Sequence, residues 1–232
     1  MNKNILIIGG SSGIGQALVK LLQDSNTIFV ANRTSEGIDT QKVTYIKYDA
    51  TEEPLDTSVL PDQLDGFVYC PGSINLRPFK GLKPETFLKD FEINVLGAVK
   101  SLQAVLKNLL ESPQASIVLF STVAVQTGMP FHASVAAAKG AIEGLTRSLA
   151  AEYAPKFRVN TIAPSITDTP LANKFLNNEV KLEKANERHP LKNIGSAKDI
   201  AHTARFLLSD ESKWMTGQIV HLDGGIGDLK TN

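Results

Sequence analysis

The chain has 232 residues, of which 42% are hydrophobic, enough to fill the core of one α/β domain spanning residues 1–232. Lysine plus arginine and aspartate plus glutamate number 24 each, so no net charge would draw nucleic acid or an anionic membrane to the protein. Cys70 is the only cysteine, which excludes an internal disulfide and a cysteine-based metal cluster. No apolar stretch approaches the roughly 20 residues that cross a bilayer, and the N-terminus reads as a strand instead of a signal peptide. We therefore expect a cytoplasmic protein.

The N-terminal segment joins a hydrophobic run to a glycine-rich turn and an amphipathic pattern. Residues 5–8 include no polar member, as a strand buried on both faces of a parallel sheet requires. Gly9, Gly13 and Gly15 follow, and leucines at 18, 21 and 22 then recur at helical spacing. Because bare backbone can approach phosphates at the N-terminus of such a helix, the segment predicts binding of a dinucleotide pyrophosphate. A tight strand-to-helix turn without a ligand is the alternative.

Further strand and helix patterns alternate along the chain. Apolar and β-branched runs predict strands at 27–32, 43–48, 66–70, 116–121, 158–163 and 218–222. Helical patterns cover 84–110, 132–153 and 197–208. This alternation predicts an α/β fold, a doubly wound Rossmann-like parallel sheet of about seven strands with helices on both faces. The connections 33–42 and 51–64 are short or contain prolines, so we expect loops there in place of the usual crossover helix.

Several motifs, in this order, resemble the short-chain dehydrogenase/reductase family along nearly the whole chain. Besides the glycine turn, Cys70-Pro71-Gly72 stands where the family has Asn-Asn-Ala-Gly, and residues 164–169 replace its Pro-Gly-x-x-x-Thr motif. The segment 216–225 is similar to the family's closing strand. The resemblance implies that a nicotinamide dinucleotide is bound by residues of these motifs, namely Gly9, Ser11, Ser12, Gly13, Ile14, Gly15, Asn32, Arg33, Thr34, Asp49, Ala50, Cys70, Pro71, Gly72, Lys139, Pro164, Ile166 and Thr169.

The resemblance also implies a catalytic set of asparagine, serine, tyrosine and lysine. Asn94 and Lys139 match two members, and Thr122 stands at the serine position, with Ser121 as the alternative one residue earlier. Hydride transfer to a carbonyl creates an alkoxide, which needs a proton donor and aligned hydrogen bonds. At the tyrosine position, four residues before the lysine, the chain has Val135, which cannot donate a proton.

Two groups are candidates to replace the tyrosine as proton donor. His132 lies seven residues before Lys139, on roughly the same helix face, and enoyl reductases of the same superfamily have their tyrosine at this spacing. Imidazole titrates near neutrality, which suits a proton donor. A water molecule held by Thr122 and Lys139 is the second candidate. His132 could instead be an ordinary, partly exposed residue that begins the helix.

The end of the second strand favours NADP(H) over NAD(H). Asn32 stands there without the acidic residue that holds both ribose hydroxyls in NAD enzymes, and Arg33 and Thr34 follow. A guanidinium suits a 2′-phosphate by charge and by its fork geometry. A solvated loop arginine is the alternative. By resemblance, Asp49 accepts a hydrogen bond from the adenine amino group, or else it caps the loop after the third strand.

The remaining features bear on the substrate and on partners. Residues 171–190 resemble the variable flap over the substrate in this family, and their charged residues look like a solvated helix face. By analogy with the family we expect a homodimer or homotetramer. His189, His202 and His221 lie too far apart in sequence to indicate a metal set, so we expect no metal site.

Two functions of different kinds remain open. The first is an NADP(H)-dependent oxidoreductase that acts on the carbonyl or alcohol group of a small molecule, and Asn94, Thr122 and Lys139 favour it. The second is a catalytically impaired NADP(H)-binding homologue that serves as a regulator or partner subunit, and Val135 favours it. The substrate itself has no coded motif.

Overall fold

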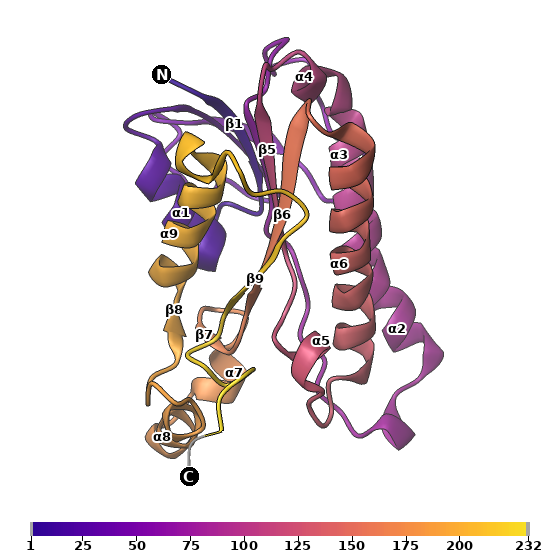
Figure 1. The fold of residues 1–232 in the computed structure, drawn as a ribbon, viewed down its shortest axis with the longest axis vertical. Helices are drawn as coiled ribbons and strands as arrows, with labels where there is room; N and C mark the ends of the chain where they lie inside the picture. Colours follow the sequence, from indigo (N-terminus) through magenta and orange to yellow (C-terminus); the bar gives the residue numbers. More distant parts are fainter. Residues whose placement is uncertain (1, 231–232) are drawn as a thin grey trace.

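A computed structural model describes residues 2–230 and contains one seven-stranded parallel sheet in the order β3-β2-β1-β4-β5-β6-β9 (Figure 1). Its neighbouring strands β1 and β4 mark the point where the strand order reverses, which is where ligands bind in open α/β sheets. The predicted doubly wound Rossmann-like fold is confirmed. The strands are β1 (Asn4–Ile8), β2 (Thr27–Asn32), β3 (Thr44–Lys47), β4 (Gly66–Tyr69), β5 (Ala115–Phe120), β6 (Phe157–Pro164) and β9 (Ile219–Leu222).

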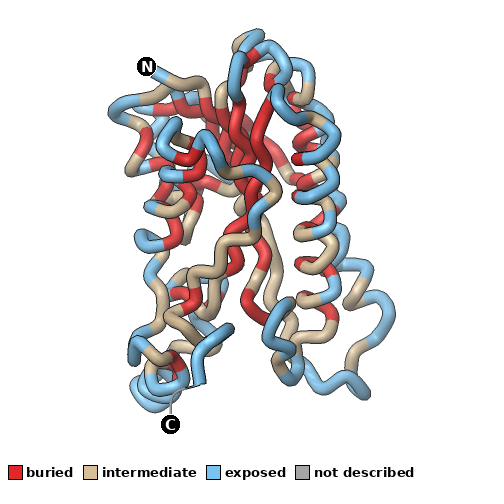
Figure 2. Tube along the Cα trace, in the orientation of Figure 1, coloured by how far each residue is buried: buried red, intermediate tan, exposed pale blue. Residues whose placement is uncertain are grey.

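Helices cover both faces of this sheet (Figure 1). One face carries α1 (Gly13–Leu22) and α9 (Ala197–Leu208), and the other carries α2 (Pro84–Phe91), α3 (Gly97–Ala104), α4 (Leu106–Leu110) and α6 (Ala133–Tyr153). Successive residues of a strand belong in turn to two apolar clusters, one on each face of the sheet. In β1, Ile5 and Ile7 pack against α1 and α9. Leu6 and Ile8 pack on the opposite face, toward α3 and α6. The buried stretches of the chain trace therefore follow the central strands (Figure 2). An all-apolar strand is explained by this two-sided burial.

The prediction of one continuous helix over 84–110 is wrong. A π-helical turn, η2 (Glu92–Leu96), follows α2, and Val105 breaks the helix again between α3 and α4. The Tyr69 hydroxyl of β4 donates to the Ile93 carbonyl at 2.6 Å, and it lies so close to Gly97 that any β-carbon there would collide with it. A side chain inserted into the helical ladder in this way opens a π turn.

The connections 33–42 and 51–64 carry no helix, as predicted. The Gln16 side chain donates to the Gly37 carbonyl at 2.9 Å, so the first of these loops packs against the start of α1. Sequence patterns set no bounds for several shorter elements, namely η1 (Phe79–Gly81), α5 (Ala124–Thr127), β7 (Thr167–Asp168), α7 (Asn173–Leu176), α8 (Glu179–Glu187), β8 (Gly195–Ser196) and η3 (Asp210–Ser212).

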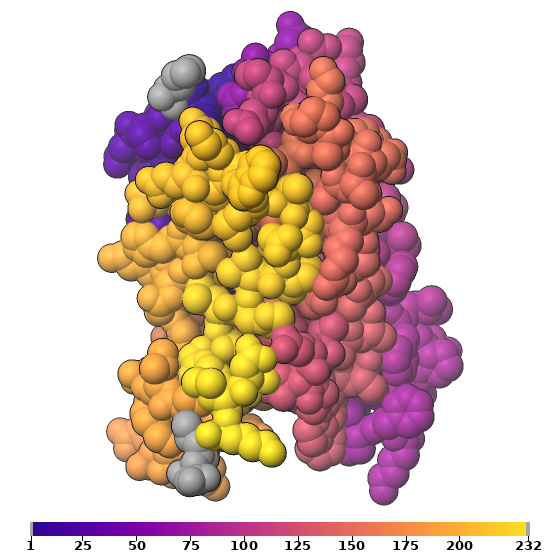
Figure 3. Space-filling view, in the orientation of Figure 1, coloured from indigo at the N-terminus to yellow at the C-terminus, as the bar shows by residue number. Residues whose placement is uncertain are grey.

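The segment 171–190 contains α7 and α8 and lies beyond the carboxyl ends of the strands, at the lower end of Figure 1. Its charged side chains are exposed, as the sequence predicted: Lys174, Glu179, Lys181, Glu183, Lys184, Glu187 and Arg188. On the face shown in Figure 3, the C-terminal segment lies over the sheet between α9 and α6. Within residues 2–230, no helix is long and apolar enough to cross a membrane. The same residues hold no group of three or more side chains able to bind a metal ion.

Candidate functional site

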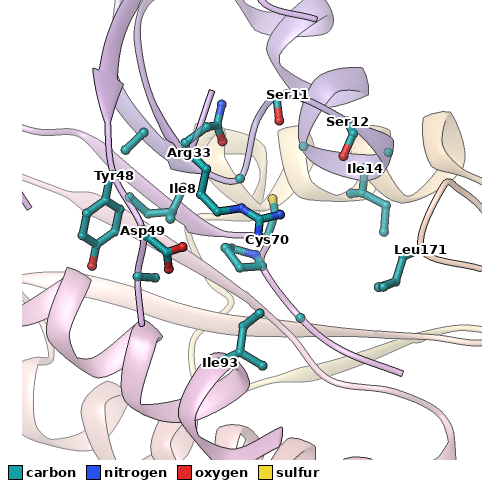
Figure 4. A pocket seen from close by; sticks show the side chains of 18 of the residues that line it. Ile8, Ser11, Ser12, Ile14, Arg33, Tyr48, Asp49, Cys70, Ile93 and Leu171 are labelled. Atoms are coloured by element: carbon teal, nitrogen blue, oxygen red, sulfur yellow. The ribbon is translucent and has the colours of Figure 1, made fainter. Parts of the chain in front are cut away.

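A cavity of about 670 Å³ opens at the carboxyl ends of β1, β2, β3 and β4 (Figure 4). Most of the residues expected to contact a dinucleotide line it: Gly9, Ser11, Ser12, Gly13, Ile14, Gly15, Asn32, Arg33, Thr34, Asp49, Ala50, Cys70, Pro71, Gly72 and Thr169. Sequence analysis missed the remaining lining residues, which are Ile8, Ala31, Tyr48, Thr51, Ile93, Pro170 and Leu171. The cavity thus occupies the switch point of the sheet.

The glycine turn keeps bare backbone at one wall of the cavity. Gly9 and Gly13 have φ values of +82° and +52°, which disfavour any other residue, and a β-carbon on Gly15 would run into the Gly9 carbonyl. Ser12 precedes α1 without a side-chain capping bond, and the first turn of the helix has no acidic residue. Free N–H groups and the positive end of the helix dipole therefore face the cavity, an arrangement able to hold an anion.

The end of β2 contributes polar groups to the same cavity. Both amide atoms of Asn32 are buried and have no hydrogen-bond partner among residues 2–230. The exposed Arg33 follows, and in Figure 4 its side chain extends across the lining residues. An unpartnered buried amide is costly unless something enters to bind it. Asn32 and Arg33 thus offer hydrogen bonds and positive charge to a polar ligand.

Asp49 caps the loop after β3, which is one of the two alternatives set out above. Its Oδ1 accepts hydrogen bonds from the backbone N–H of Thr51 at 2.9 Å and from the Thr51 hydroxyl at 2.7 Å. These two bonds, aided by the positive charge of Arg33, hold the pKa of Asp49 below its ordinary value. The carboxylate lines the cavity in its charged form.

Gly72 joins the cavity to Asn94 and Lys139. A β-carbon on Gly72 would lie 3.0 Å from Asn94 Oδ1 and 3.4 Å from Lys139 Nζ, so these two atoms converge on the lining residue. Lys139 is only 9% exposed, and burial lowers the pKa of its ammonium to about 8, against the opposing effects of Cys70 and Asp90. Burial also raises the pKa of the Cys70 thiol to about 12. The structure therefore gathers a buried lysine and an asparagine oxygen at one end of the cavity.

The loop after β5 distinguishes Thr122 from Ser121. The Ser121 hydroxyl donates to the Glu143 carboxylate at 2.7 Å, so its proton is already engaged by α6. Thr122 Oγ1 accepts a hydrogen bond from the Ala124 N–H at 3.4 Å, which leaves its own proton available. The N–H of Val123 donates to the Pro164 carbonyl at 3.0 Å and ties this loop to the end of β6.

Six of the predicted site residues do not line the cavity: Asn94, Thr122, His132, Lys139, Pro164 and Ile166. His132 is half-buried at the start of α6, and its Nδ1 lies 2.7 Å from the Pro130 carbonyl, so Nδ1 carries a proton and only Nε2 is free to act. Val135 is buried one turn further along. Within residues 2–230 no hydrogen bond connects His132 with Lys139, so its predicted role stays a prediction.

Residues 9–227 match the family described as Enoyl-(Acyl carrier protein) reductase. A 2,5-dichloro-2,5-cyclohexadiene-1,4-diol dehydrogenase of Sphingobium indicum is 30% identical over 240 residues, covering 96% of both chains. Carbonyl reductase [NADPH] 2 of Sus scrofa is 30% identical over 233 residues, covering 95% of this chain and 94% of the relative. The names of these two relatives indicate different substrates, so they do not identify the substrate of this chain.

One relative is described as not active. The inactive 2-(S)-hydroxypropyl-CoM dehydrogenase 2 of Xanthobacter autotrophicus is 33% identical over 168 residues, covering 70% of this chain and 73% of the relative. Among solved structures, a short chain dehydrogenase family protein from Francisella tularensis subsp. tularensis SCHU S4 has a TM-score of 0.90 at 29% identity, covering 99% of this chain and 100% of that chain. The matched family, the relatives and the shared fold show that this chain belongs to the short-chain dehydrogenase/reductase family of oxidoreductases.

Proposed function

We propose that this chain is an NADP(H)-dependent oxidoreductase that transfers hydride between the cofactor and the carbonyl or alcohol group of a small molecule. The observation that carries the proposal is the continuity of the site. One cavity connects the glycine turn and Arg33 with Gly72, where Asn94 and Lys139 converge. A dinucleotide bound along it would have phosphates at one end and a reactive ring at the other.

The residues present fit such a cofactor. Bare backbone at Gly9 and Gly15 leaves room for a pyrophosphate, and the unpartnered Asn32 amide has hydrogen bonds to give to the adenosine end. Arg33 supports NADP(H) over NAD(H), because a guanidinium pairs with a 2′-phosphate and the end of β2 has no carboxylate to hold two ribose hydroxyls. The sequence relative described as NADPH-dependent is consistent with this preference.

The chain's own residues would act on the substrate oxygen. When bound, the nicotinamide ring supplies or accepts the hydride. Thr122 would donate a hydrogen bond to the substrate oxygen, because the Ser121 hydroxyl already donates its hydrogen bond to Glu143. Lys139 would hold the nicotinamide ribose and place positive charge near the developing alkoxide, and its low pKa makes it sensitive to pH near neutrality.

The proposed site differs from the family's catalytic set in its proton donor. We propose that Val135 occupies the position of the family's tyrosine, and that His132 through Nε2, or a water held by Thr122 and Lys139, takes over its role. A general acid contributes about 10²–10⁴-fold to such a step, so positioning and the cofactor would still support a slower reaction.

A second function is favoured by Val135. The chain would bind NADP(H) without turnover, as a regulator or as a partner subunit of an active homologue. Its likeness to a relative described as inactive supports this alternative. In both versions we propose that residues 171–190 form a flap over the substrate and that the protein is a cytoplasmic homodimer or homotetramer.

Two measurements test the proposed function. The first is calorimetric titration with NADPH and NADH, for which we expect NADPH to bind more tightly. The second follows NADPH absorbance with a panel of ketones, aldehydes and enones for the wild type, Val135→Tyr and His132→Ala. Binding of neither cofactor at millimolar concentration would overturn both functions.

The two variants separate the two functions. If His132→Ala abolishes a measurable wild-type rate, His132 is the surrogate acid. If His132→Ala keeps the wild-type rate, the water remains as donor. If the wild type shows no rate and Val135→Tyr creates ketone reduction, the native chain is a binder without turnover.

A further inference from the structure

A fully buried carboxylate lies beside the reacting end of the site, and the proposed reaction does not use it. Asp90 of α2 is 0% exposed. Its Oδ1 accepts hydrogen bonds from the Ser73 hydroxyl at 2.5 Å and from the Asn75 amide at 2.6 Å, whereas Oδ2 has no partner among residues 2–230. Burying a carboxylate without a paired cation is costly, so its presence here calls for a physical reason.

Ser73 links this carboxylate to the asparagine of the site. Asn94 Nδ2 donates both of its hydrogens, one to Ser73 Oγ at 2.9 Å and one to the Asp90 carbonyl at 2.7 Å. With the amide nitrogen fixed on this side, Asn94 Oδ1 must point to the other. That oxygen is buried, has no partner within the described chain, and converges with Lys139 Nζ on Gly72.

These contacts form a directed series. Asn94 donates through Nδ2 to Ser73, and Ser73 donates in turn to Asp90, while Asn94 Oδ1 and the Lys139 ammonium, which can only donate, both lie beside Gly72 without a hydrogen bond between them. Every donor therefore points away from the ammonium and toward the carboxylate. Such a series is polarised along its length, because each bond strengthens the next in a medium of low dielectric.

We propose that Asp90 is a positioning residue for Lys139, which acts through Ser73 and Asn94 to aim an amide oxygen at the ammonium and to keep that ammonium charged inside the protein. The positive charge of Lys139 in turn compensates the buried carboxylate. No proton has to travel along the series, because its role is orientation and charge. The inference rests on the proposed function only for the role of Lys139 toward the cofactor.

Few other ionisable groups act on this pair. Besides Asp90, the Cys70 thiol at the end of β4 influences Lys139, and on its own helix the Glu143 carboxylate is held by Ser121. His132, at the start of α6, bonds to Pro130. Around Asp90, the charged residues of α2, of the following turn, of the segment after β4 and of α7 are exposed: Glu85, Lys89, Glu92, Arg77 and Lys174. Asp90 is thus the buried carboxylate available to Lys139.

The test measures the ionisation of Lys139 without the cofactor. Trace labelling with acetic anhydride at a series of pH values, read out by peptide mass spectrometry, gives the pH at which Lys139 loses its proton. In Asp90→Asn, which keeps the side-chain volume, we expect this pH to fall by about one unit, the effect of a nearby counter-charge at moderate effective dielectric. Glu92→Gln is the matched control, because it removes an exposed carboxylate two residues away and should leave the profile unchanged.

Ser73→Ala supplies a second, independent variant. It keeps the carboxylate but breaks the link to Asn94, so we expect a smaller fall in the same profile together with weaker NADPH binding. A Lys139 profile that superposes on the wild type in folded Asp90→Asn would overturn the inference. If Asp90→Asn does not fold, an unchanged profile in Ser73→Ala would overturn it. Because the labelling needs no cofactor, a failed NADPH titration would leave this result readable.

Discussion

The two ends of the cavity differ in the groups that they offer to a ligand. At the dinucleotide end, the glycine turn is intact, α1 presents free N–H groups, and Asn32 and Arg33 offer polar contacts. At the end that we propose to be the reacting one, Asn94 and Lys139 converge on Gly72, Val135 stands four residues before the lysine, and the buried Asp90 is linked to Asn94 through Ser73. The proposed cofactor binding and the proposed proton transfer therefore depend on different elements, so a variant can be expected to change one without the other.

Replacement of the buried Lys139 should have the largest effect on the free energy of unfolding. It tests the proposed reacting end of the cavity. Lys139 has a pKa of about 8 in the folded protein and an ordinary one near 10.5 when unfolded. Below pH 8 both states are charged and burial opposes folding. Between pH 8 and 10.5 the folded state loses its proton first, so this residue's contribution to the free energy of unfolding rises with pH by roughly 3 kcal/mol.

The stability of Lys139→Met relative to the wild type should therefore fall by roughly 3 kcal/mol between pH 8 and 10.5, on top of a constant difference that comes from leaving the buried Asp90 carboxylate without its counter-charge. Urea unfolding of both proteins at several pH values measures it. Taking the difference between the proteins cancels the titration of Cys70 and Tyr69, which have raised pKa values and the opposite slope. A pH-independent difference would contradict the buried, easily deprotonated lysine. The variant should also lose turnover.

Gly15→Ala tests the dinucleotide end of the cavity. The added β-carbon meets the Gly9 carbonyl, which is backbone and cannot rotate away, so the turn must shift. We expect a loss of about 1–3 kcal/mol in the free energy of unfolding, as for other overpacked sites, and no NADPH binding at concentrations that saturate the wild type. Gly81→Ala is the control, since nothing lies within 4 Å of its β-carbon position. Equal NADPH affinity in Gly15→Ala would remove the close backbone approach from the proposal.

Arg33→Ala tests whether the dinucleotide end of the cavity distinguishes NADPH from NADH. Loss of a charge-assisted contact to a 2′-phosphate should weaken NADPH binding about 10- to 100-fold. NADH has no such phosphate, so its affinity should stay the same. Calorimetric titration of both cofactors measures the ratio. An equal loss for the two cofactors would mean that Arg33 contacts a part of the dinucleotide that they share.

Ser121→Ala and Thr122→Val should give the smallest effects. Together they show which hydroxyl contributes to stability and which contributes to the reaction rate. Removing the Ser121 hydroxyl leaves the half-buried Glu143 carboxylate without its donor, so we expect a stability loss of about 1 kcal/mol and an unchanged rate. Thr122→Val should lower kcat at least tenfold with little change in stability. The rate is measured in the wild-type protein or, if that protein has no measurable turnover, in the Val135→Tyr variant. The opposite pattern would make Ser121 the reacting hydroxyl.

The sequence predicted those parts of the fold and site that depend on neighbouring residues. Apolar runs located the central strands to within one or two residues, and the glycine spacing located the turn that lines the cavity. The end of β2 was readable for the same reason, because Asn32, Arg33 and Thr34 follow directly on a strand. Boundaries moved where hydrogen bonds to other elements set the last residue.

Features made by contacts distant in sequence could not be predicted. The π turn depends on the Tyr69 hydroxyl, which meets Ile93 from 24 residues away. The buried series through Ser73 joins two segments whose residue types look like an ordinary loop and helix. Similarly, Tyr48 and Leu171 line the cavity because the sheet and the following loops bring them there. Only the folded arrangement reveals these neighbours.

The absent helix between β2 and β3 has a consequence for solubility. Strand β3 borders the sheet, and within residues 2–230 it pairs with β2 alone. Such a border strand offers unpaired backbone groups to other chains and can seed aggregation. Here the strand is four residues long, and its two ends, Thr44 and Lys47, are exposed. A strand this short, which ends in an exposed positive charge, is a poor template for pairing with a strand of another chain at this edge of the sheet.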